Sequence, residues 1–198
     1  MRQSEQSTAE PTAPTSLYEL KKTVVMVGMM GAGKTAVGRA LAAKLRVPFM
    51  DSDAEIERAA DRSIPEIFDR DGEAFFRQRE AEVIERLLKN NSGVLSTGGG
   101  AFLFERNRKT ISTYGVSIWL NADLELLWQR VRHRDTRPLL QTPDPKTTLT
   151  EIFHARVPIY RKTDLSVLCQ PQLSVEETAD RVIDTLKTRK DVLRVSDA

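Results

Sequence analysis

The sequence has a single cysteine, Cys169, among its 198 residues. One thiol cannot form an intramolecular disulfide, and no Cys or His residues have the spacing of a structural zinc site. This cysteine usage is typical of a reducing compartment, so we expect a cytoplasmic protein. No hydrophobic run approaches the ~20 residues of a membrane span, and the N-terminus lacks the apolar centre of a secretory signal. We therefore expect no membrane partner.

The sequence also has little net charge. Thirty Lys and Arg residues against 28 Asp and Glu residues give +2. Such a balance produces no long-range field that would favour nucleic acid, so we expect no nucleic acid partner and any anion site must be local. The composition, 40% hydrophobic and 29% charged, is that of an ordinary globular protein. The length suits one domain, and we expect a monomer.

Composition divides the chain into three parts. Residues 1–20 are rich in Ser, Thr, Pro, Gln and Glu with almost no large apolar side chains, so they cannot offset the entropy of ordering. We expect a flexible leader there, one compact domain over residues 21–188 and a polar tail over 189–198. Within the domain, the polar, proline-rich stretch 134–149 has no periodicity. A loop of that length is typical of a lid or of disorder, and we expect a mobile lid.

Short apolar runs alternate with amphipathic segments along the domain. Residues 24–27 form a continuous apolar run, typical of a strand that is buried on both faces. Next, Val37, Leu41 and Leu45 recur every four residues and form one apolar stripe on a helix. Further strands are expected at 47–50, 94–95, 116–120 and 165–168, and further helices at 53–61, 67–88 with a break near 71–72, 104–113, 124–131, 149–160 and 175–186. This alternation predicts a three-layer α/β/α fold in which helices cover both faces of a parallel sheet.

The turn between the first strand and the first helix has a phosphate-binding pattern. Residues 28–35 read GMMGAGKT, which matches G-x-x-x-x-G-K-[ST]. Phosphates need several inward-pointing N–H groups, and residues without a Cβ let the backbone curl closely around them. The helix N-terminus adds a positive dipole end. Lys34 can then reach the outer phosphates, and the Thr35 hydroxyl can hold Mg²⁺.

Several classes of nucleotide-binding protein are disfavoured by missing motifs. The chain has no Asn-Lys-x-Asp tetrapeptide to read guanine, and no apolar strand that ends in Asp-Glu as in motor ATPases. The glycine-rich turn has no G-x-G-x-x-G, so hydride transfer with a dinucleotide is also disfavoured. A small-molecule kinase remains the favoured class.

Two carboxylates follow the second expected strand, at Asp51 and Asp53. Their spacing beside a phosphate loop suggests separate roles, one toward Mg²⁺ through water and one toward an acceptor hydroxyl. A simpler alternative is that one of them only caps the helix that follows.

Other candidate residues lie at strand ends or in loops. Arg77 follows two aromatic residues and is suited to two-point pairing with a carboxylate, although a solvated charge is the alternative. The glycines at 98–100 directly follow an apolar strand, which favours close approach of a ligand over a merely flexible turn. Arg130 and Arg137 lie just before and within the expected lid, where an arginine can stabilise a transferring phosphate.

These residues together resemble the shikimate kinase family. The resemblance runs in consistent order over roughly residues 23–187, through GMMGAGKTAVGRALA, FMDSD, SIPEIF, GEAFFRQRE, VLSTGGGAF, RPLL and RVPIY. It implies a P-loop kinase with a five-stranded parallel sheet. The implied reaction transfers the γ-phosphate of ATP to the 3-hydroxyl of shikimate, a step on the route to chorismate and the aromatic amino acids.

The resemblance also implies residue roles. It implies that ATP is bound by Gly31, Ala32, Gly33, Lys34, Thr35, Ala36, Arg130 and Arg137, with Arg130 on the adenine. It implies that shikimate is bound by Asp53, Arg77, Gly98, Gly99, Gly100 and Arg156, with the two arginines on its carboxylate. Thr35 would hold Mg²⁺ and Asp51 would support the ion through water. Lys34, Asp53 and Arg137 would be the catalytic residues, with Asp53 as the base.

Two alternatives stay open. A related kinase for gluconate or for a nucleoside monophosphate would share the loop and the lid, although two arginines and Asp53 suit a small hydroxy acid better than a base. A catalytically silent nucleotide-binding module would signal by lid closure. The presence of Asp53 together with Lys34 disfavours that module, because binding alone requires no base.

Overall fold

A five-stranded, all-parallel sheet forms the centre of the protein. The computed structural model describes residues 17–133 and 138–196. The strands lie in the order β3-β4-β2-β5-β6. Their bounds are Thr23–Val27 for β2, Phe49–Asp51 for β3, Val94–Ser96 for β4, Gly115–Asn121 for β5 and Leu165–Leu168 for β6. The sheet confirms the parallel arrangement and the strand count that the sequence predicts.

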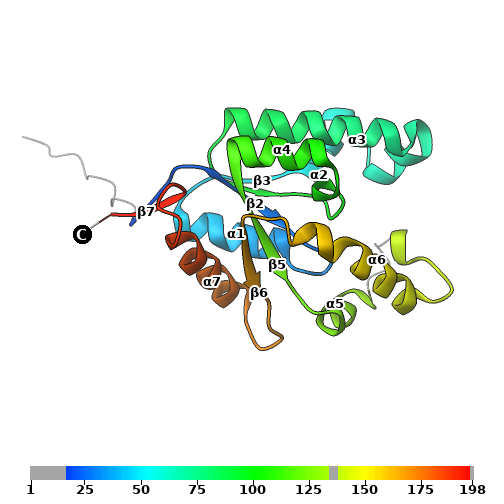
Figure 1. Cartoon of the computed structure of the whole chain (residues 1–198). Coiled ribbons are helices and arrows are strands. Elements are labelled where there is room, and N and C mark those ends of the chain that lie inside the picture. The colour runs from blue at the N-terminus through cyan, green and yellow to red at the C-terminus, as the bar shows by residue number, and fades with distance from the viewer. Residues whose placement is uncertain (1–16, 134–137, 197–198) are drawn as a thin grey trace, which may run out of the picture.

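Helices cover both faces of this sheet. They are α1 (Lys34–Leu45), α2 (Ser52–Ala60), α3 (Ile64–Asn90), α4 (Glu105–Tyr114), α5 (Leu124–Val131), α6 (Pro145–Tyr160) and α7 (Val175–Lys187). Figure 1 shows α3 and α4 on one side of the sheet and α1 and α7 on the other. All five residues of β2 are buried between these layers, which explains its continuous apolar run. The three-layer α/β/α fold is therefore confirmed.

The strand order brings three strand ends to one place. β2 lies between β4 and β5, so the chain leaves β2 toward one edge of the sheet and later returns to its other side. Met26 of β2 pairs with Ser96 of β4, which in turn pairs with Asp51 of β3. The carboxyl ends of these strands therefore lie side by side. Open parallel sheets bind ligands at such a point, where the strand order reverses.

The long helix α3 is broken where the sequence predicts it. Gly72 has φ 80° and ψ 171°, a conformation outside the helical region and strained for residues with a Cβ. The segment after Gly72 starts a new helical run that carries Arg77. The break thus determines how the second half of α3 faces the sheet.

The ends of the domain differ from the expectation of a flexible leader through residue 20 and a polar tail from residue 189. β1 (Tyr18–Leu20) pairs antiparallel with β7 (Leu193–Val195), so the two ends form a small sheet of their own. Val192 and Leu193 are buried, which supplies the apolar contact that holds this pair. Three-residue strands carry too little periodicity for the sequence to reveal them. The leader over residues 1–16 lies outside the described residues.

Part of the stretch 134–149, which the sequence predicts as a mobile lid, is helical in the structure. Helix α6 begins at Pro145, four residues before the predicted start, because Asp144 caps it by accepting from the Thr147 N–H. A short 3₁₀ turn, η2, spans Pro138–Leu140. Residues 134–137, including Arg137, lie outside the described part. Among residues 17–133 and 138–196, no helix is long and apolar enough to cross a membrane.

Candidate functional site

The glycine-rich turn forms a tight loop between β2 and α1. Gly33 is the N-cap of α1 with φ 96°, a left-handed conformation that favours glycine. Gly31 has φ 80°, and a Cβ there would lie 2.7 Å from Val131 Cγ1. Lys34 Nζ donates to the carbonyl oxygens of Gly28 and Met29 at 2.9 and 3.0 Å. Its ammonium group therefore lies over the loop in which phosphates would be held.

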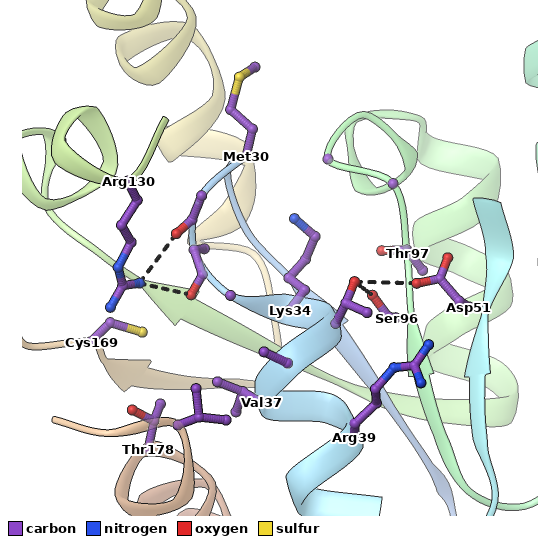
Figure 2. A pocket seen from close by; sticks show the side chains of 18 of the residues that line it. Met30, Lys34, Val37, Arg39, Asp51, Ser96, Thr97, Arg130, Cys169 and Thr178 are labelled. Atoms are coloured by element: carbon purple, nitrogen blue, oxygen red, sulfur yellow. Dashed lines mark hydrogen bonds between the residues drawn. The ribbon is translucent and has the colours of Figure 1, made fainter. Parts of the chain in front are cut away.

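A cavity of about 660 Å³ opens over this loop and contains most of the predicted nucleotide-binding residues. Figure 2 shows its side chains. The loop and the N-terminus of α1 line its centre, including Gly31, Ala32, Gly33, Lys34, Thr35 and Ala36. Asp51 lies toward one end of the lining, and Cys169 and Thr178 lie toward the other (Figure 2). Asp53 and Gly98 also line the cavity. An elongated ligand with a negatively charged middle fits this distribution of groups.

Arg130 lies at the end of the cavity that holds Cys169. Its Nη1 donates to the carbonyl oxygens of Gly31 and Ala32 at 3.2 and 3.4 Å (Figure 2). The guanidinium therefore braces the phosphate loop from the side of α5. Burial raises the pKa of the Cys169 thiol to about 11, which favours the protonated thiol and makes it a poor nucleophile.

Thr35, Asp51 and Ser96 meet where three segments converge. The Thr35 hydroxyl lies 3.3 Å from Asp51 Oδ2 and 3.3 Å from the Ser96 hydroxyl. Asp51 Oδ1 meanwhile accepts from the N–H groups of Asp53 and Ala54 and caps α2. The helix-cap alternative and the site role are therefore compatible, because each carboxylate oxygen has its own partner.

Asp53 is held in a largely buried position on the first turn of α2. Its Oδ1 is buried and has no hydrogen-bond partner. Burial, and secondarily the Asp51 carboxylate, raise the pKa of Asp53, while the nearby Lys34 ammonium opposes this shift. A raised pKa makes a carboxylate a stronger base. Asp53 is thus a suitable proton acceptor for a hydroxyl that enters the cavity.

The three glycines at 98–100 each face a different charged side chain. A Cβ on Gly98 would lie 2.8 Å from Asp53 Oδ1, and one on Gly100 would lie 2.8 Å from Arg77 Nη2. Gly99 faces Arg156, whose Nη1 lies 3.6 Å from the corresponding position. Because these three glycines have no side chains, charged groups from three helices can all approach the same turn. Close approach explains this run of glycines better than flexibility does.

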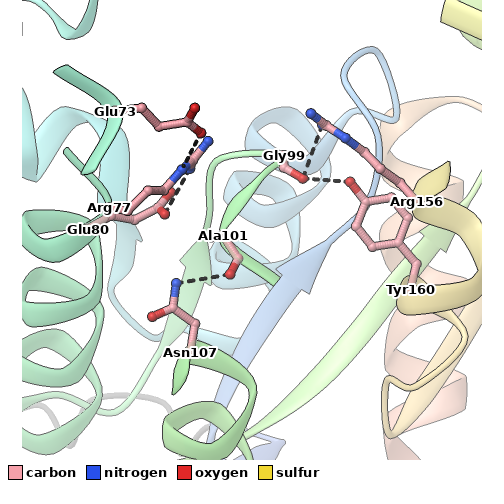
Figure 3. Close-up of polar contacts among 8 residues, drawn as sticks. All are labelled: Glu73, Arg77, Glu80, Gly99, Ala101, Asn107, Arg156 and Tyr160. Carbon is pink, nitrogen blue, oxygen red and sulfur yellow. Dashed lines mark hydrogen bonds and ion pairs between the residues drawn. The ribbon is translucent and has the colours of Figure 1, made fainter. Parts of the chain in front are cut away.

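Arg77 is a fixed cation rather than a solvated one. Its side chain is only 21% exposed, and its Nη1 donates to Glu80 Oε2 at 2.9 Å (Figure 3). The guanidinium also lies 5.0 Å from the ring centroids of Phe76 and Phe104. Glu80 is buried, and this burial raises its pKa although Arg77 opposes the shift.

Arg156 and Tyr160 approach the same turn from α6. The Tyr160 hydroxyl donates to the Gly99 carbonyl at 2.6 Å, and Arg156 Nη1 lies 3.5 Å from the same oxygen (Figure 3). Tyr160 is fully buried, and burial raises the pKa of its hydroxyl. Arg77 and Arg156 therefore lie on opposite sides of the glycine turn, with Asp53 at its start.

The structure thus brings together all the predicted site residues except Arg137, which lies outside the described residues. The sequence analysis assigns no role to Ser96, Glu80 or Tyr160. Each of them stands inside a motif quoted above, respectively VLSTGGGAF, GEAFFRQRE and RVPIY. The spacing of Arg77 and Glu80 at i and i+3 on one helix is the signal that could have identified that pair.

Comparison with known proteins identifies the family. A family model for shikimate kinase matches residues 30–187. The chain is 67% identical to the shikimate kinase of Ruegeria pomeroyi over 89% of this chain and 91% of that one, and 60% identical to the shikimate kinase of Cereibacter sphaeroides over 91% and 90%. The structure resembles the shikimate kinase from Acinetobacter baumannii in complex with shikimate, with a TM-score of 0.80, 37% identity and coverage of 85% and 94%. The chain belongs to the shikimate kinase family.

Proposed function

We propose that this protein transfers the γ-phosphate of ATP to the 3-hydroxyl of shikimate, within the synthesis of chorismate and the aromatic amino acids. The observation that carries the proposal is the glycine turn at 98–100, on which Asp53, Arg77 and Arg156 converge beside a phosphate loop. Family membership supports the same reaction. A cytoplasmic location and a monomeric state remain predictions of the sequence.

ATP would lie along the cavity, with its phosphates on residues 31–36. Backbone N–H groups and the α1 dipole would hold the phosphates, and Lys34 would exchange its carbonyl partners for phosphate oxygens. The adenine would lie toward Arg130 and Cys169, because the phosphate loop separates that end from Asp53. Arg137 keeps its predicted role at the transferring phosphate, as a lid residue.

The residues at the strand ends fit a magnesium ion. Thr35 would hold Mg²⁺ through its hydroxyl, and Asp51 would support it through water, with Ser96 beside them. Within residues 17–133 and 138–196, no cluster of three or more His, Cys, Asp or Glu residues could hold a metal. Mg²⁺ suits such a site because it keeps waters and takes phosphate oxygens as ligands. When bound, the ion would neutralise charge on the β- and γ-phosphates.

The acceptor would be oriented by charge at both ends. Arg77 and Arg156 would bind its carboxylate, and Gly99 would lie against its ring. Asp53 would then accept the proton of the 3-hydroxyl while that oxygen bonds to the γ-phosphorus and the bond to ADP breaks. Phosphoryl transfer needs positioning and charge neutralisation more than covalent chemistry, and these groups supply both.

The first test is ADP release by the purified chain with ATP and Mg²⁺, with shikimate, gluconate or AMP as acceptor. We expect strong release with shikimate and little with gluconate or AMP, because gluconate has no ring to lie against Gly99 and AMP has no carboxylate for Arg77 and Arg156. Release with gluconate or AMP instead would keep the phosphate-loop roles and overturn the acceptor. ATP binding without release in any mixture would favour the silent nucleotide-binding module.

A further inference from the structure

Arg77 carries two carboxylate partners on its own helix. Its Nε donates to Glu73 Oε1 at 3.2 Å, and its Nη1 donates to Glu80 Oε2 at 2.9 Å (Figure 3). Both contacts are ion pairs, at i−4 and i+3 from the arginine. One guanidinium therefore has two acidic groups within α3, before any acceptor carboxylate arrives.

The two partners differ in how firmly they are held. The Glu80 side chain is 1% exposed, so moving it would require its buried surroundings to change. The Glu73 side chain is 64% exposed, and Glu73 directly follows the non-helical Gly72. Water can solvate the Glu73 carboxylate as soon as it leaves Arg77, so exchange costs little.

The positions of the contacts show which edge of the guanidinium each carboxylate covers. A guanidinium offers two edges for two-point pairing, one formed by Nε and Nη2 and the other by Nη1 and Nη2. Glu73 occupies Nε on the first edge, and Glu80 occupies Nη1 on the second. Nη1 and Nη2 both lie beside the glycine turn, 2.9 and 2.8 Å from the position that a Cβ on Gly100 would take. Because Glu80 already pairs with Nη1, Nη2 is the donor on this side that is left for an acceptor carboxylate.

We propose that Glu73 competes with the acceptor carboxylate for the Nε–Nη2 edge of Arg77 and thereby sets acceptor affinity. This inference rests on the proposed function, in which Arg77 binds that carboxylate. Glu80 keeps Nη1 in place throughout, while Glu73 leaves when the acceptor binds. With the acceptor bound, Arg77 then pairs with the fixed carboxylate of Glu80 and with the carboxylate of the acceptor. Glu73 is thus a specificity-determining residue whose removal improves binding, unlike a residue that merely supports the site.

The test is the variant Glu73→Gln, with Glu82→Gln as the matched control. Glu82 lies on the same helix and pairs with Arg79 at 2.8 Å, so its neutralisation makes the same change in net charge away from Arg77. We expect KM for shikimate and its Kd, measured by calorimetry without ATP, to fall about two- to fivefold in Glu73→Gln. KM for ATP and kcat should stay unchanged. Shikimate methyl ester, which lacks the carboxylate charge, should show no such gain.

The outcomes separate this inference from the function on which it rests. An unchanged or raised KM in Glu73→Gln, an equal fall in Glu82→Gln, or an equal gain for the methyl ester would each overturn the competition. Glu73→Ala, which removes both oxygens, should shift KM in the same direction as Glu73→Gln. A parallel Arg77→Ala variant tests the proposed function itself. If Arg77→Ala leaves KM for shikimate unchanged, the arginine does not bind the acceptor; if it raises KM while Glu73→Gln changes nothing, only the competition fails.

Discussion

The proposed site has two halves that are built in different ways: a nucleotide half in the cavity over the phosphate loop, and an acceptor half around the glycine turn at 98–100. The phosphate-binding part of the nucleotide half comes from one continuous segment, in which strand β2, the turn at residues 28–33 and helix α1 follow each other along the chain. The acceptor half comes from four separate places, at Asp53, Arg77, residues 98–100 and Arg156. Backbone N–H groups and a helix dipole dominate the first half, whereas side-chain charges held by other side chains dominate the second.

This difference predicts how the halves respond to mutation. The phosphate loop depends mainly on local backbone conformation and on Arg130, so its geometry should survive changes in the acceptor half. The acceptor half depends on contacts between α2, α3, α6 and the glycine turn, so a single added methyl group or a lost hydrogen bond can displace a charged group. Substitutions in the acceptor half should therefore alter shikimate kinetics while ATP binding stays intact.

The largest effect is expected from Asp53→Asn. Removal of the base should lower kcat about 10²–10⁴-fold, while the Kd for ATP stays near that of the unchanged protein. The exposed Asp184, which pairs with Lys187 on α7, provides the control Asp184→Asn. Stopped assays of ADP formation and calorimetry with ATP measure the two quantities. A kcat within a few-fold of the unchanged protein would contradict the role of Asp53 as the base.

The same carboxylate sets a pH dependence. Because burial raises the pKa of Asp53, its protonated form persists to higher pH than that of an ordinary aspartate, and kcat/KM should fall on the acid side within that raised range. Because the buried site disfavours the charged carboxylate, the folded protein is more stable while Asp53 is protonated. This contribution to stability is lost as the pH rises through the raised pKa of Asp53 in the folded state. Asp53→Asn should therefore raise the melting temperature at neutral pH although it removes activity. A lower melting temperature would contradict the burial cost.

A smaller effect is expected from alanine at two neighbouring glycines. In Gly100→Ala the new methyl group would crowd Arg77 Nη2, so KM for shikimate should rise about tenfold, or about 1.4 kcal/mol, with a smaller change in kcat. In Gly98→Ala the methyl group would crowd Asp53 Oδ1 instead, so kcat should fall more than KM rises. Steady-state kinetics with varied shikimate measure both, and each variant is the control for the other. Identical kinetic changes in the two variants would show that the turn acts only as a flexible loop.

The same contrast explains how far the sequence predicts the protein. The phosphate loop and the fold class follow from the sequence because a short motif and alternating periodicity determine them locally. Asp53, Arg77 and Arg156 are recognisable as candidates from their residue types and the family resemblance, but their convergence on residues 98–100 depends on tertiary packing. Glu80 pairs with Arg77 and Tyr160 donates to Gly99. The spacing from Arg77 is a local signal for Glu80, but no local pattern distinguishes Tyr160 from an ordinary helix residue.

The short strands β1 and β7 are not predicted by the periodicity of the sequence. Leu20 pairs with Leu193 across the two ends of the chain, a separation that no window of sequence covers. The neighbouring residues 1–16 and 189–191 are largely polar, so a local sequence pattern predicts no strand at either end. Prediction from local periodicity therefore fails here for the long-range pairing of short segments.

The smallest effect is expected from Tyr160→Phe, which removes one hydrogen bond and leaves the ring in place. The Gly99 carbonyl would lose its 2.6 Å donor and keep only the longer contact with Arg156. The free energy of unfolding should fall by about 1 kcal/mol, or roughly 2–4 °C in melting temperature. KM for shikimate should rise about two- to fivefold, because Gly99 would lie against the acceptor ring and Arg156 is one turn away on α6.

Tyr114→Phe is the control, since Tyr114 is 40% exposed and lies at the end of α4. It should change neither the melting temperature nor KM. Thermal denaturation and steady-state kinetics with each substrate varied in turn distinguish the cases. If Tyr160→Phe raises KM for ATP and leaves KM for shikimate unchanged, the hydroxyl supports the nucleotide half, and the two halves of the site are coupled more closely than their separate construction suggests. If only KM for shikimate rises, a buried hydroxyl on α6 maintains the acceptor half without influence on the phosphate loop.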